Sequence, residues 1–266
     1  MTKKEAMTAA VRCRRVVPVP YAIKFTVEAR QRYAAHLGRD FDPVEETGSY
    51  VVASHTNHGW DEIQPGHFRD TFGVVWNRTQ DRTLGVVDDP PIKTPSFRGV
   101  AFPDADAVPL YGFIERDKRR YPDLFHMASI GFALFERAWS LCGMEQLMIW
   151  MATEPTFVKE LMARIADYNC RLIANAAELG VDCIHYGDDW GTQHGLLFSP
   201  EMWQELIRPD FARMCVQARK NGLLNSLHSC GKVDELIPAM IECGVDVFDP
   251  FQPEVMDARA VKREYE

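Results

Sequence analysis

The fold is decided by the stretch TEPTFVKELMARIADYNCRLIANAAELGVDCIHYG, residues 153–187. Its apolar side chains recur every three or four residues, which predicts a helix that begins at Thr153–Pro155 and ends at Gly180. The run from Val181 to Gly187 is short and largely apolar, as in a buried strand. The helical positions that set the period are Phe157, Leu161, Ile165, Tyr168, Leu172, Ala176 and Leu179.

The same alternation of helix and strand continues towards the end of the chain. Ser199-Pro200-Glu201 has the cap, the proline and the acid that begin a helix, and Pro209 is expected to kink or split it. Further elements predicted from the pattern are the strands Leu223–His228 and Val245–Asp249, the helix Val233–Cys243, and in the first half the helix Glu28–Leu37 and the strands Val16–Tyr21, Tyr50–Ser54 and His126–Ile130.

Strands that alternate with helices indicate a parallel α/β sheet, either open and doubly wound or closed into a barrel. A dinucleotide-binding sheet is disfavoured, because Gly187, Gly191 and Gly195 are spaced by four and fit no phosphate-binding loop. The chain is predicted to form a single domain, residues 1–266, with a long irregular insertion at about 61–123 that is rich in proline. Loops of this length usually serve a function, such as covering a site.

Charge and composition exclude several classes of protein. Thirty Lys and Arg against 38 Asp and Glu give a net charge of -8, so nucleic acid is not an expected partner. No apolar run is long enough to span a bilayer or to act as a signal peptide, so a cytoplasmic location without membrane contact is expected. Seven cysteines without paired spacing indicate reduced thiols.

Polar residues gather where three successive strands are predicted to end. They are the segments 185–191, with Asp188 and Asp189, 228–232, and 249–252. In parallel α/β folds the active site lies at the carboxyl ends of the strands, so these segments are candidates for one site. The alternative at each position is structural, since either aspartate can cap a turn and Asp249 can belong to the turn before Pro250.

His228 and Cys230 are the sharpest pair in these segments. Residues two apart on a strand point to the same side, and imidazole and thiolate are preferred zinc ligands. Two ligands do not complete a catalytic zinc site, and His185 and His194 are candidates for a third. A buried thiol beside a hydrogen-bonded core histidine is the alternative, because His-x-Cys alone is weak evidence.

Taken together, the motifs resemble the uroporphyrinogen decarboxylase superfamily, and within it the corrinoid-linked methyltransferase branch. The resemblance covers nearly the whole chain and implies a (β/α)8 TIM barrel. It also implies that this sequence lacks the last two strands, which family members carry beyond the position of Glu266. The matching segments are 17–20 (VPVP), 70–76 (DTFGVVW), 187–191 (GDDWG), 199–203 (SPEMW), 227–231 (LHSCG) and 249–253 (DPFQP).

The resemblance implies a zinc-dependent enzyme that moves a methyl group from a methylated corrinoid protein to a thiol, such as coenzyme M, or to tetrahydrofolate. His228 and Cys230 would hold the zinc. The branch takes a second cysteine from near its C-terminus, and here no cysteine follows Cys243. Asp188 and Asp189 would orient His228 or bind the acceptor. Substrate-binding residues would be Tyr186, Trp190, Gln193 and Gln252.

Two alternatives stay open beside the methyltransferase. A porphyrinogen decarboxylase would carry an Arg-rich loop after the first strand, where this chain has Tyr21-Ala22-Ile23-Lys24-Phe25. A non-catalytic tetrapyrrole or corrinoid binder would lack a complete ligand set. A small-molecule methyl acceptor and a corrinoid protein are the expected partners, and a homodimer is an open alternative to a monomer.

Overall fold

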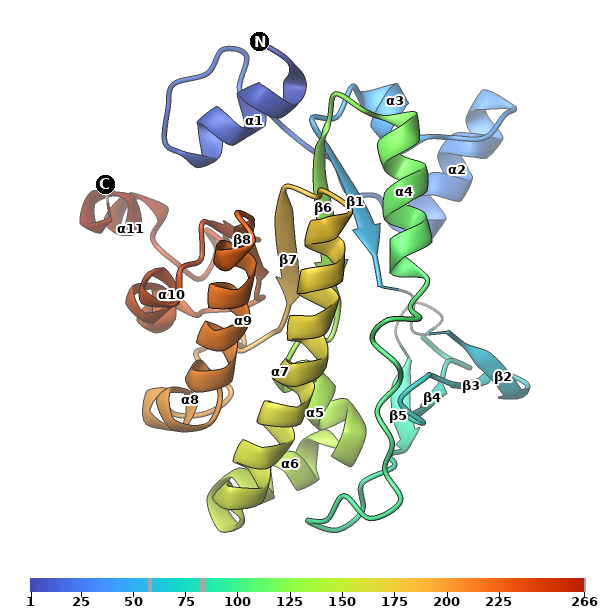
Figure 1. Ribbon diagram of the computed structural model, residues 1–266, viewed down its shortest axis with the longest axis vertical. Helices are drawn as coiled ribbons and strands as arrows, with labels where there is room; N and C mark the ends of the chain where they lie inside the picture. Colours follow the sequence, from blue (N-terminus) through green and yellow to red (C-terminus); the bar gives the residue numbers. More distant parts are fainter. Residues whose placement is uncertain (57–58, 82–84, 266) are drawn as a thin grey trace.

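The computed structural model describes residues 1–56, 59–81 and 85–265 (Figure 1). Its centre is a five-stranded parallel sheet in the order β1-β6-β7-β8-β9. The strands are β1 (Val51–His55), β6 (Phe125–Ile130), β7 (Cys183–Gly187), β8 (Leu224–His228) and β9 (Val247–Asp249). The predicted parallel α/β architecture is therefore confirmed, whereas among the described residues the sheet does not close into a barrel of eight strands.

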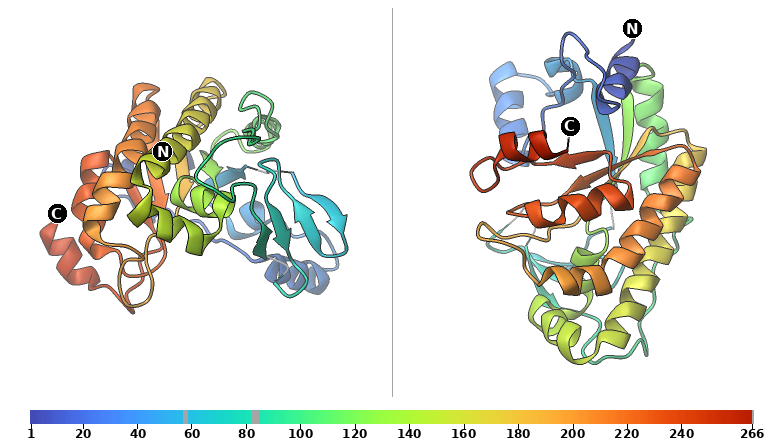
Figure 2. Two further views of the ribbon diagram at one scale, coloured as in Figure 1. Left: turned by 90° about the horizontal axis from the view of Figure 1, so that it is seen from below. Right: turned by 90° about the vertical axis from the view of Figure 1, so that its left-hand side faces the viewer.

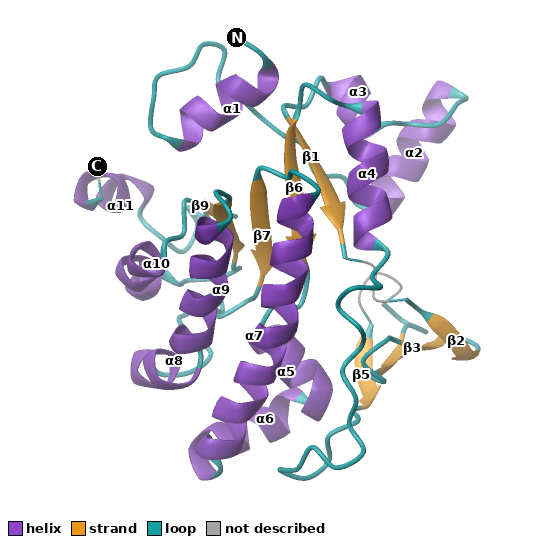
Figure 3. Ribbon diagram, viewed as in Figure 1, coloured by secondary structure: helices purple, strands orange, loops and turns teal. Residues whose placement is uncertain are grey.

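Helices cover one face of this sheet. α4 (Leu110–Arg120), α7 (Pro155–Glu178) and α9 (Arg208–Lys220) run side by side along it in Figures 1 and 2. The remaining helices, purple in Figure 3, are α1 (Lys3–Val11), α2 (Val27–Leu37), α3 (Pro43–Thr47), α5 (Phe135–Cys142), α6 (Met144–Thr153), α8 (Pro200–Leu206), α10 (Ile237–Cys243) and α11 (Ala258–Glu264), with a 3-10 turn at Asp234–Leu236.

The long helix α7 confirms the periodicity argument. It begins at Pro155, and its apolar stripe is buried, with Leu161 and Leu172 fully inaccessible to solvent. The predicted split at Pro209 is also present, because α8 ends at Leu206 and α9 begins at Arg208. Proline lacks the N–H that a continuous helix would need at this position.

The predicted strand Val16–Tyr21 is wrong. The segment bends at Val17–Pro18 and belongs to neither sheet, and Val17 and Val19 are each 75% exposed. Pro18 and Pro20 have no N–H to donate to a neighbouring strand, which prevents a regular ladder. A backbone hydrogen bond joins the segment to the residue before β1: the Tyr50 N–H donates to the Tyr21 carbonyl at 2.9 Å.

The insertion at 61–123 is not irregular throughout. It contains a four-stranded antiparallel sheet in the order β2-β3-β4-β5, as well as α4. These strands have three or four residues each, too short for alternation to stand out in the sequence. The sheet lies beyond the carboxyl end of β1 (Figures 1 and 2). Its strands are β2 (Asp61–Gln64), β3 (His67–Arg69), β4 (Val75–Asn77) and β5 (Val86–Asp89).

Two expectations about the whole chain can be compared with the structure. All seven cysteines are free thiols, as their spacing predicted, and four of them are buried. Among the described residues, none of the helices combines the length and the apolar character needed to cross a bilayer.

Candidate functional site

The three polar segments are tied together by backbone hydrogen bonds at the carboxyl ends of β7, β8 and β9. The Asp188 N–H donates to the His228 carbonyl at 3.0 Å, and the Ser229 N–H donates to the Asp249 carbonyl at 3.0 Å. The Trp190 N–H donates to the Ser229 hydroxyl, also at 3.0 Å. Parallel pairing thus brings residues about 20 and about 40 positions apart in the chain to one edge of the sheet, as predicted.

Close approach of two loops depends on glycine. Gly231 has φ +88°, and a Cβ there would lie 2.6 Å from Gly191 C and from Thr192 O. A Cβ at Gly191 would in turn lie 2.7 Å from the Cys230 carbonyl oxygen. Only residues without a side chain therefore allow the loop after β8 to pack on the loop after β7.

His228, Cys230 and Asp189 form one cluster at this edge. The Cys230 Sγ lies 3.4 Å from the His228 Nε2, and the Asp189 Oδ1 lies 3.7 Å from the same nitrogen. The Cys230 N–H donates to the Asp189 Oδ1 at 2.8 Å, which fixes the carboxylate beside the thiol. The His228 and Asp189 side chains are 32% and 39% exposed, so the cluster is open to solvent.

The opposite side of the His228 ring faces a second cluster. The Asp249 Oδ2 lies 3.7 Å from the His228 Nδ1 and 2.7 Å from the Lys24 Nζ. The other Asp249 oxygen lies 3.6 Å from the Nδ1 of His185, a nitrogen that is also 2.9 Å from the Ser226 hydroxyl. His185 was a candidate third zinc ligand and lies here, whereas the other candidate, His194, is exposed in the loop after β7.

Burial and neighbouring charges shift the protonation of these groups. Burial, together with Asp189 and Glu136, raises the pKa of the Cys230 thiol to about 11. Burial lowers the pKa of His185 to about 4, so its ring is neutral at pH 7. Burial also acts to raise the pKa of Asp249, but the contacts with His228 and Lys24 outweigh it and hold that pKa well below its usual range.

The structure does not bring Asp188 to this site. Its side chain is fully buried and accepts hydrogen bonds from the N–H groups of Leu134, Phe135 and Glu136 at 2.8–3.2 Å, at the start of α5. It also accepts the Trp190 Nε1–H at 2.7 Å. Burial outweighs these hydrogen bonds and raises the pKa of Asp188 to about 6. Asp188 caps the start of α5, so its role is structural, although the structural alternative expected it to cap a turn.

Tyr186 and Trp190 also lie away from the cluster, among the helices. The Tyr186 hydroxyl donates to the Asn225 Oδ1 at 3.0 Å, and its ring packs against Phe211 of α9. Trp190 packs edge-on against Trp203 and Phe211, and both Tyr186 and Trp190 are fully buried. Neither side chain is accessible to a substrate in this structure.

The two predicted glutamines differ in position. The Gln252 Oε1 accepts a hydrogen bond from the Gly231 N–H, so this side chain supports the loop that carries Cys230. Gln193 is exposed in the loop 191–196, which closes on itself through the pairing of Gly191 with Leu196.

Glu136 is a residue near the site that the sequence did not reveal. Burial raises its pKa to about 9, and the nearby Asp188 and Asp189 add to the shift. In the sequence it is an acid in the first turn of a helix, where acids are common. Its proximity to Cys230 depends on how α5 is placed by Asp188, which no local pattern predicts.

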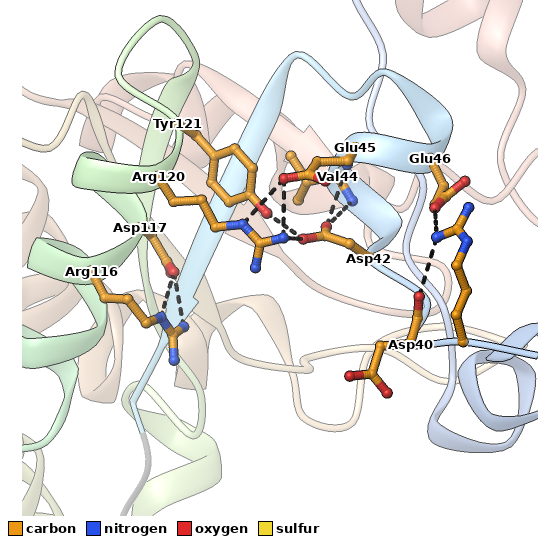
Figure 4. Close-up of polar contacts among 10 residues, drawn as sticks. Asp40, Asp42, Val44, Glu45, Glu46, Arg116, Asp117, Arg120 and Tyr121 are labelled. Atoms are coloured by element: carbon orange, nitrogen blue, oxygen red, sulfur yellow. Dashed lines mark hydrogen bonds and ion pairs between the residues drawn. The ribbon is translucent and has the colours of Figure 1, made fainter.

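A cavity of about 770 Å³ lies elsewhere, between α3, α4 and β1. Figure 4 shows that several of its charged side chains are paired with one another: Arg120 contacts Asp42 and Glu45, and Arg116 contacts Asp117. The Arg39 guanidinium and the Glu46 carboxylate form a further pair. Neither His228 nor Cys230 is among the residues that line this cavity.

The fold and the cluster define a parallel α/β protein with a candidate metal centre at the carboxyl ends of its strands. The model of the uroporphyrinogen decarboxylase (URO-D) family matches residues 72–263, and the chain belongs to this family.

Two relatives extend the comparison. The methylated-thiol--coenzyme M methyltransferase of Methanosarcina mazei is 24% identical over 169 residues, which are 60% of this chain and 45% of the relative. The chain thus spans less than half of that curated protein. The solved structure of a methyltransferase from Methanosarcina mazei superposes with a TM-score of 0.71 at 16% identity, covering 93% of this chain and 75% of that one. At this sequence identity, the superposition shows that the two proteins share a fold.

Proposed function

We propose that the chain is a methyltransferase that moves a methyl group from a methylated corrinoid protein to a thiol, with a zinc ion held by His228, Cys230 and Asp189. The observation that carries the proposal is the cluster of three donor atoms, with the Sγ–Nε2 and Nε2–Oδ1 distances of 3.4 and 3.7 Å. The family and the curated relative support the reaction class.

The donor set fits zinc in spacing and chemistry. Bond lengths of about 2.0–2.3 Å in a tetrahedral site place N, O and S donors about 3.4–3.6 Å apart, close to the spacing here. A thiol with a pKa near 11 between carboxyl groups is protonated at pH 7, and a divalent cation would favour its thiolate. Asp189 supplies the third donor of this cluster.

His228, Cys230 and Asp189 would hold the zinc at which the acceptor is activated. Bound zinc would supply Lewis acidity that keeps the acceptor sulfur deprotonated, its proton leaving to solvent. The acceptor sulfur would then form a bond to the methyl carbon, while the methyl–cobalt bond breaks and leaves its electron pair on the corrinoid. Coenzyme M is the acceptor named in the relative, and tetrahydrofolate is the alternative acceptor.

The sheet β2–β5 is the proposed docking surface for the corrinoid protein. It lies beyond the carboxyl end of β1, on the side of the parallel sheet where the cluster lies. The segment after it is packed rather than loose, since Ile92 is 1% exposed and the Phe97 ring contacts Phe157.

The test measures metal content and thiol methylation in one set of proteins. The wild type is expected to bind one zinc and to methylate a thiol with free methylcobalamin as donor, and both properties are expected to be lost in Cys230→Ser. Asp189→Asn is expected to weaken zinc binding by at least tenfold. Cys13→Ser is the matched control, because Cys13 is an exposed thiol outside the cluster.

Three results would count against the proposal. A wild type that cannot be loaded with zinc, or a Cys230→Ser variant with full activity, would remove the metal centre. Decarboxylation of uroporphyrinogen by the metal-free protein would favour the decarboxylase alternative.

A further inference from the structure

His228 has two ring nitrogens in different surroundings. Its Nε2 faces the Cys230 thiol and Asp189, whereas its Nδ1 faces the Asp249 carboxylate. A neutral imidazole carries one proton, so one nitrogen donates and the other offers a lone pair. Which nitrogen is protonated therefore decides whether a lone pair points at the thiol cluster.

Asp249 is held firmly at its place beside the ring. Its Cα pairs with that of His228 in the register of β8 and β9, and its carbonyl accepts the Ser229 N–H. The Lys24 ammonium lies 2.7 Å from the Oδ2. Backbone pairing and this ion pair thus fix an ionised carboxylate on the far side of His228 from Cys230.

We propose that Asp249 is a positioning residue that keeps the His228 proton on Nδ1, so that the Nε2 lone pair faces Cys230 and Asp189. A carboxylate next to one imidazole nitrogen favours the proton on that nitrogen and also fixes the ring orientation. Asp189 lies as far from Nε2 as Asp249 lies from Nδ1, but the Cys230 thiol, 3.4 Å from Nε2, can donate its S–H to a lone pair on that nitrogen, whereas the Asp249 carboxylate beside Nδ1 can only accept. The Nδ1–Oδ2 separation of 3.7 Å exceeds a hydrogen bond by roughly half an ångström, and such contacts often tighten when a site is filled.

Two neighbours support this assignment of roles. The His185 Nδ1 has a nearer partner than Asp249, because it lies 2.9 Å from the Ser226 hydroxyl and 3.6 Å from the Asp249 Oδ1. Lys24 reaches the carboxylate from the segment before α2, and the Lys24 side chain is 70% exposed. The Lys24 ammonium lies beside the Asp249 Oδ2, and its positive charge disfavours this oxygen as a direct metal ligand.

The first arm of the test needs no metal. In metal-free protein labelled with ¹⁵N in histidine, long-range ¹H–¹⁵N correlation spectra report the tautomer of each ring, and the His228→Gln variant assigns the signals of His228. The wild type is expected to show His228 protonated on Nδ1. Asp249→Leu is expected to move the proton to Nε2 in most molecules, and Asp249→Asn is expected to restore it to Nδ1, because the amide oxygen can still accept a hydrogen bond.

The second arm measures zinc affinity by competition with a chelator and rests on the proposed function. Loss of a carboxylate that orients a metal-bound histidine typically weakens binding by about 10–100-fold, and Asp249→Leu is expected to fall in this range. Glu254→Leu is the matched control, since Glu254 is an exposed acid in the loop after β9. If Asp249→Leu does not fold, Asp249→Ala replaces it with the same expected result.

The two arms fail separately. An unchanged His228 tautomer in Asp249→Leu would overturn the positioning role, whatever the zinc affinity. A tautomer that shifts as expected in a protein that never binds zinc would uphold the role of Asp249 and overturn the proposed metal centre.

Discussion

Two adjacent aspartates show how one residue step separates a structural from a candidate functional side chain. Asp188 turns towards the helices, where it accepts three hydrogen bonds from the start of α5 and a fourth from the Trp190 indole, whereas Asp189 turns towards Cys230. Successive residues that leave a strand point to opposite faces, so only one of the two can reach the cluster. The sequence pair Asp-Asp does not reveal which one does.

The buried Glu136 carboxyl predicts that the stability of the protein depends on pH. Its pKa is raised to about 9, so the folded protein holds a proton that the unfolded chain releases above pH 4.5. The stabilising effect of that proton is complete below pH 4.5 and is lost as pH rises towards 9. We expect Glu136→Gln to gain roughly 1–3 kcal/mol of stability over the wild type between pH 5 and 9. Urea unfolding at several pH values measures this difference.

The control for this prediction is Glu145→Gln, which alters an exposed acid at the start of α6. Its stability is expected to follow the wild type across the same range. If the free energy of unfolding changed with pH in the same way for Glu136→Gln and the wild type, Glu136 would be ionised in the folded protein.

At the scale of elements, the loops after β7 and β8 are positioned by a contact that excludes side chains. The Lys232 N–H donates to the Thr192 carbonyl at 2.8 Å directly beside Gly231. Because Cys230 immediately precedes Gly231, any movement of this contact also moves the thiol. The geometry of the cluster therefore depends on loop packing as well as on strand pairing.

Gly231→Ala tests that dependence. The added Cβ would lie 2.6 Å from backbone atoms of Gly191 and Thr192, and the φ of +88° disfavours any side chain. We expect a loss of about 1–3 kcal/mol in stability and a weaker zinc site. Gly195→Ala, in the loop after β7 and with no atom within 4 Å of its added Cβ, is expected to match the wild type in both measurements.

For the molecule as a whole, a buried ion pair joins the antiparallel sheet to helix α5. The Arg137 guanidinium of α5 lies 3.0 Å from the Asp70 Oδ2, and their side chains are 2% and 1% exposed. Asp70, which lies between β3 and β4, also accepts hydrogen bonds from the N–H groups of Phe72 and Val74. The insertion is thus part of the same core as the helix that Asp188 caps.

Arg137→Met would leave Asp70 buried without its cation. The expected loss of stability is about 3–5 kcal/mol, because an unpaired charge in the interior is costly. Lys159→Met, which removes an exposed ion pair with Glu205, is expected to cost less than about 1 kcal/mol. Chemical denaturation measures both, and similar small losses in the two variants would show that the insertion is held mainly by apolar packing.

The sequence by itself determined the repeating part of this protein. The period of α7, the proline between α8 and α9 and the short apolar strands were predictable because helices and strands bury side chains at regular intervals. His228 and Cys230 could be chosen as a pair because residues two apart on a strand share a face, but β8 ends at His228 and Cys230 lies in the loop after it. The short strands β2–β5 have too few residues to show a period. The strand predicted at Val16–Tyr21 from hydrophobicity does not form, because Pro18 and Pro20 cannot donate backbone hydrogen bonds.

Only the tertiary structure decided which polar residues meet. Asp189, Lys24 and Asp249 reach His228 from segments that lie far apart in the chain, and Glu136 approaches Cys230 because a distant aspartate caps its helix. Parallel pairing and loop contacts set these distances, since they depend on the relative position of whole elements. A local sequence pattern fixes the direction of a side chain on its own element, but its neighbours come from the packing of the others.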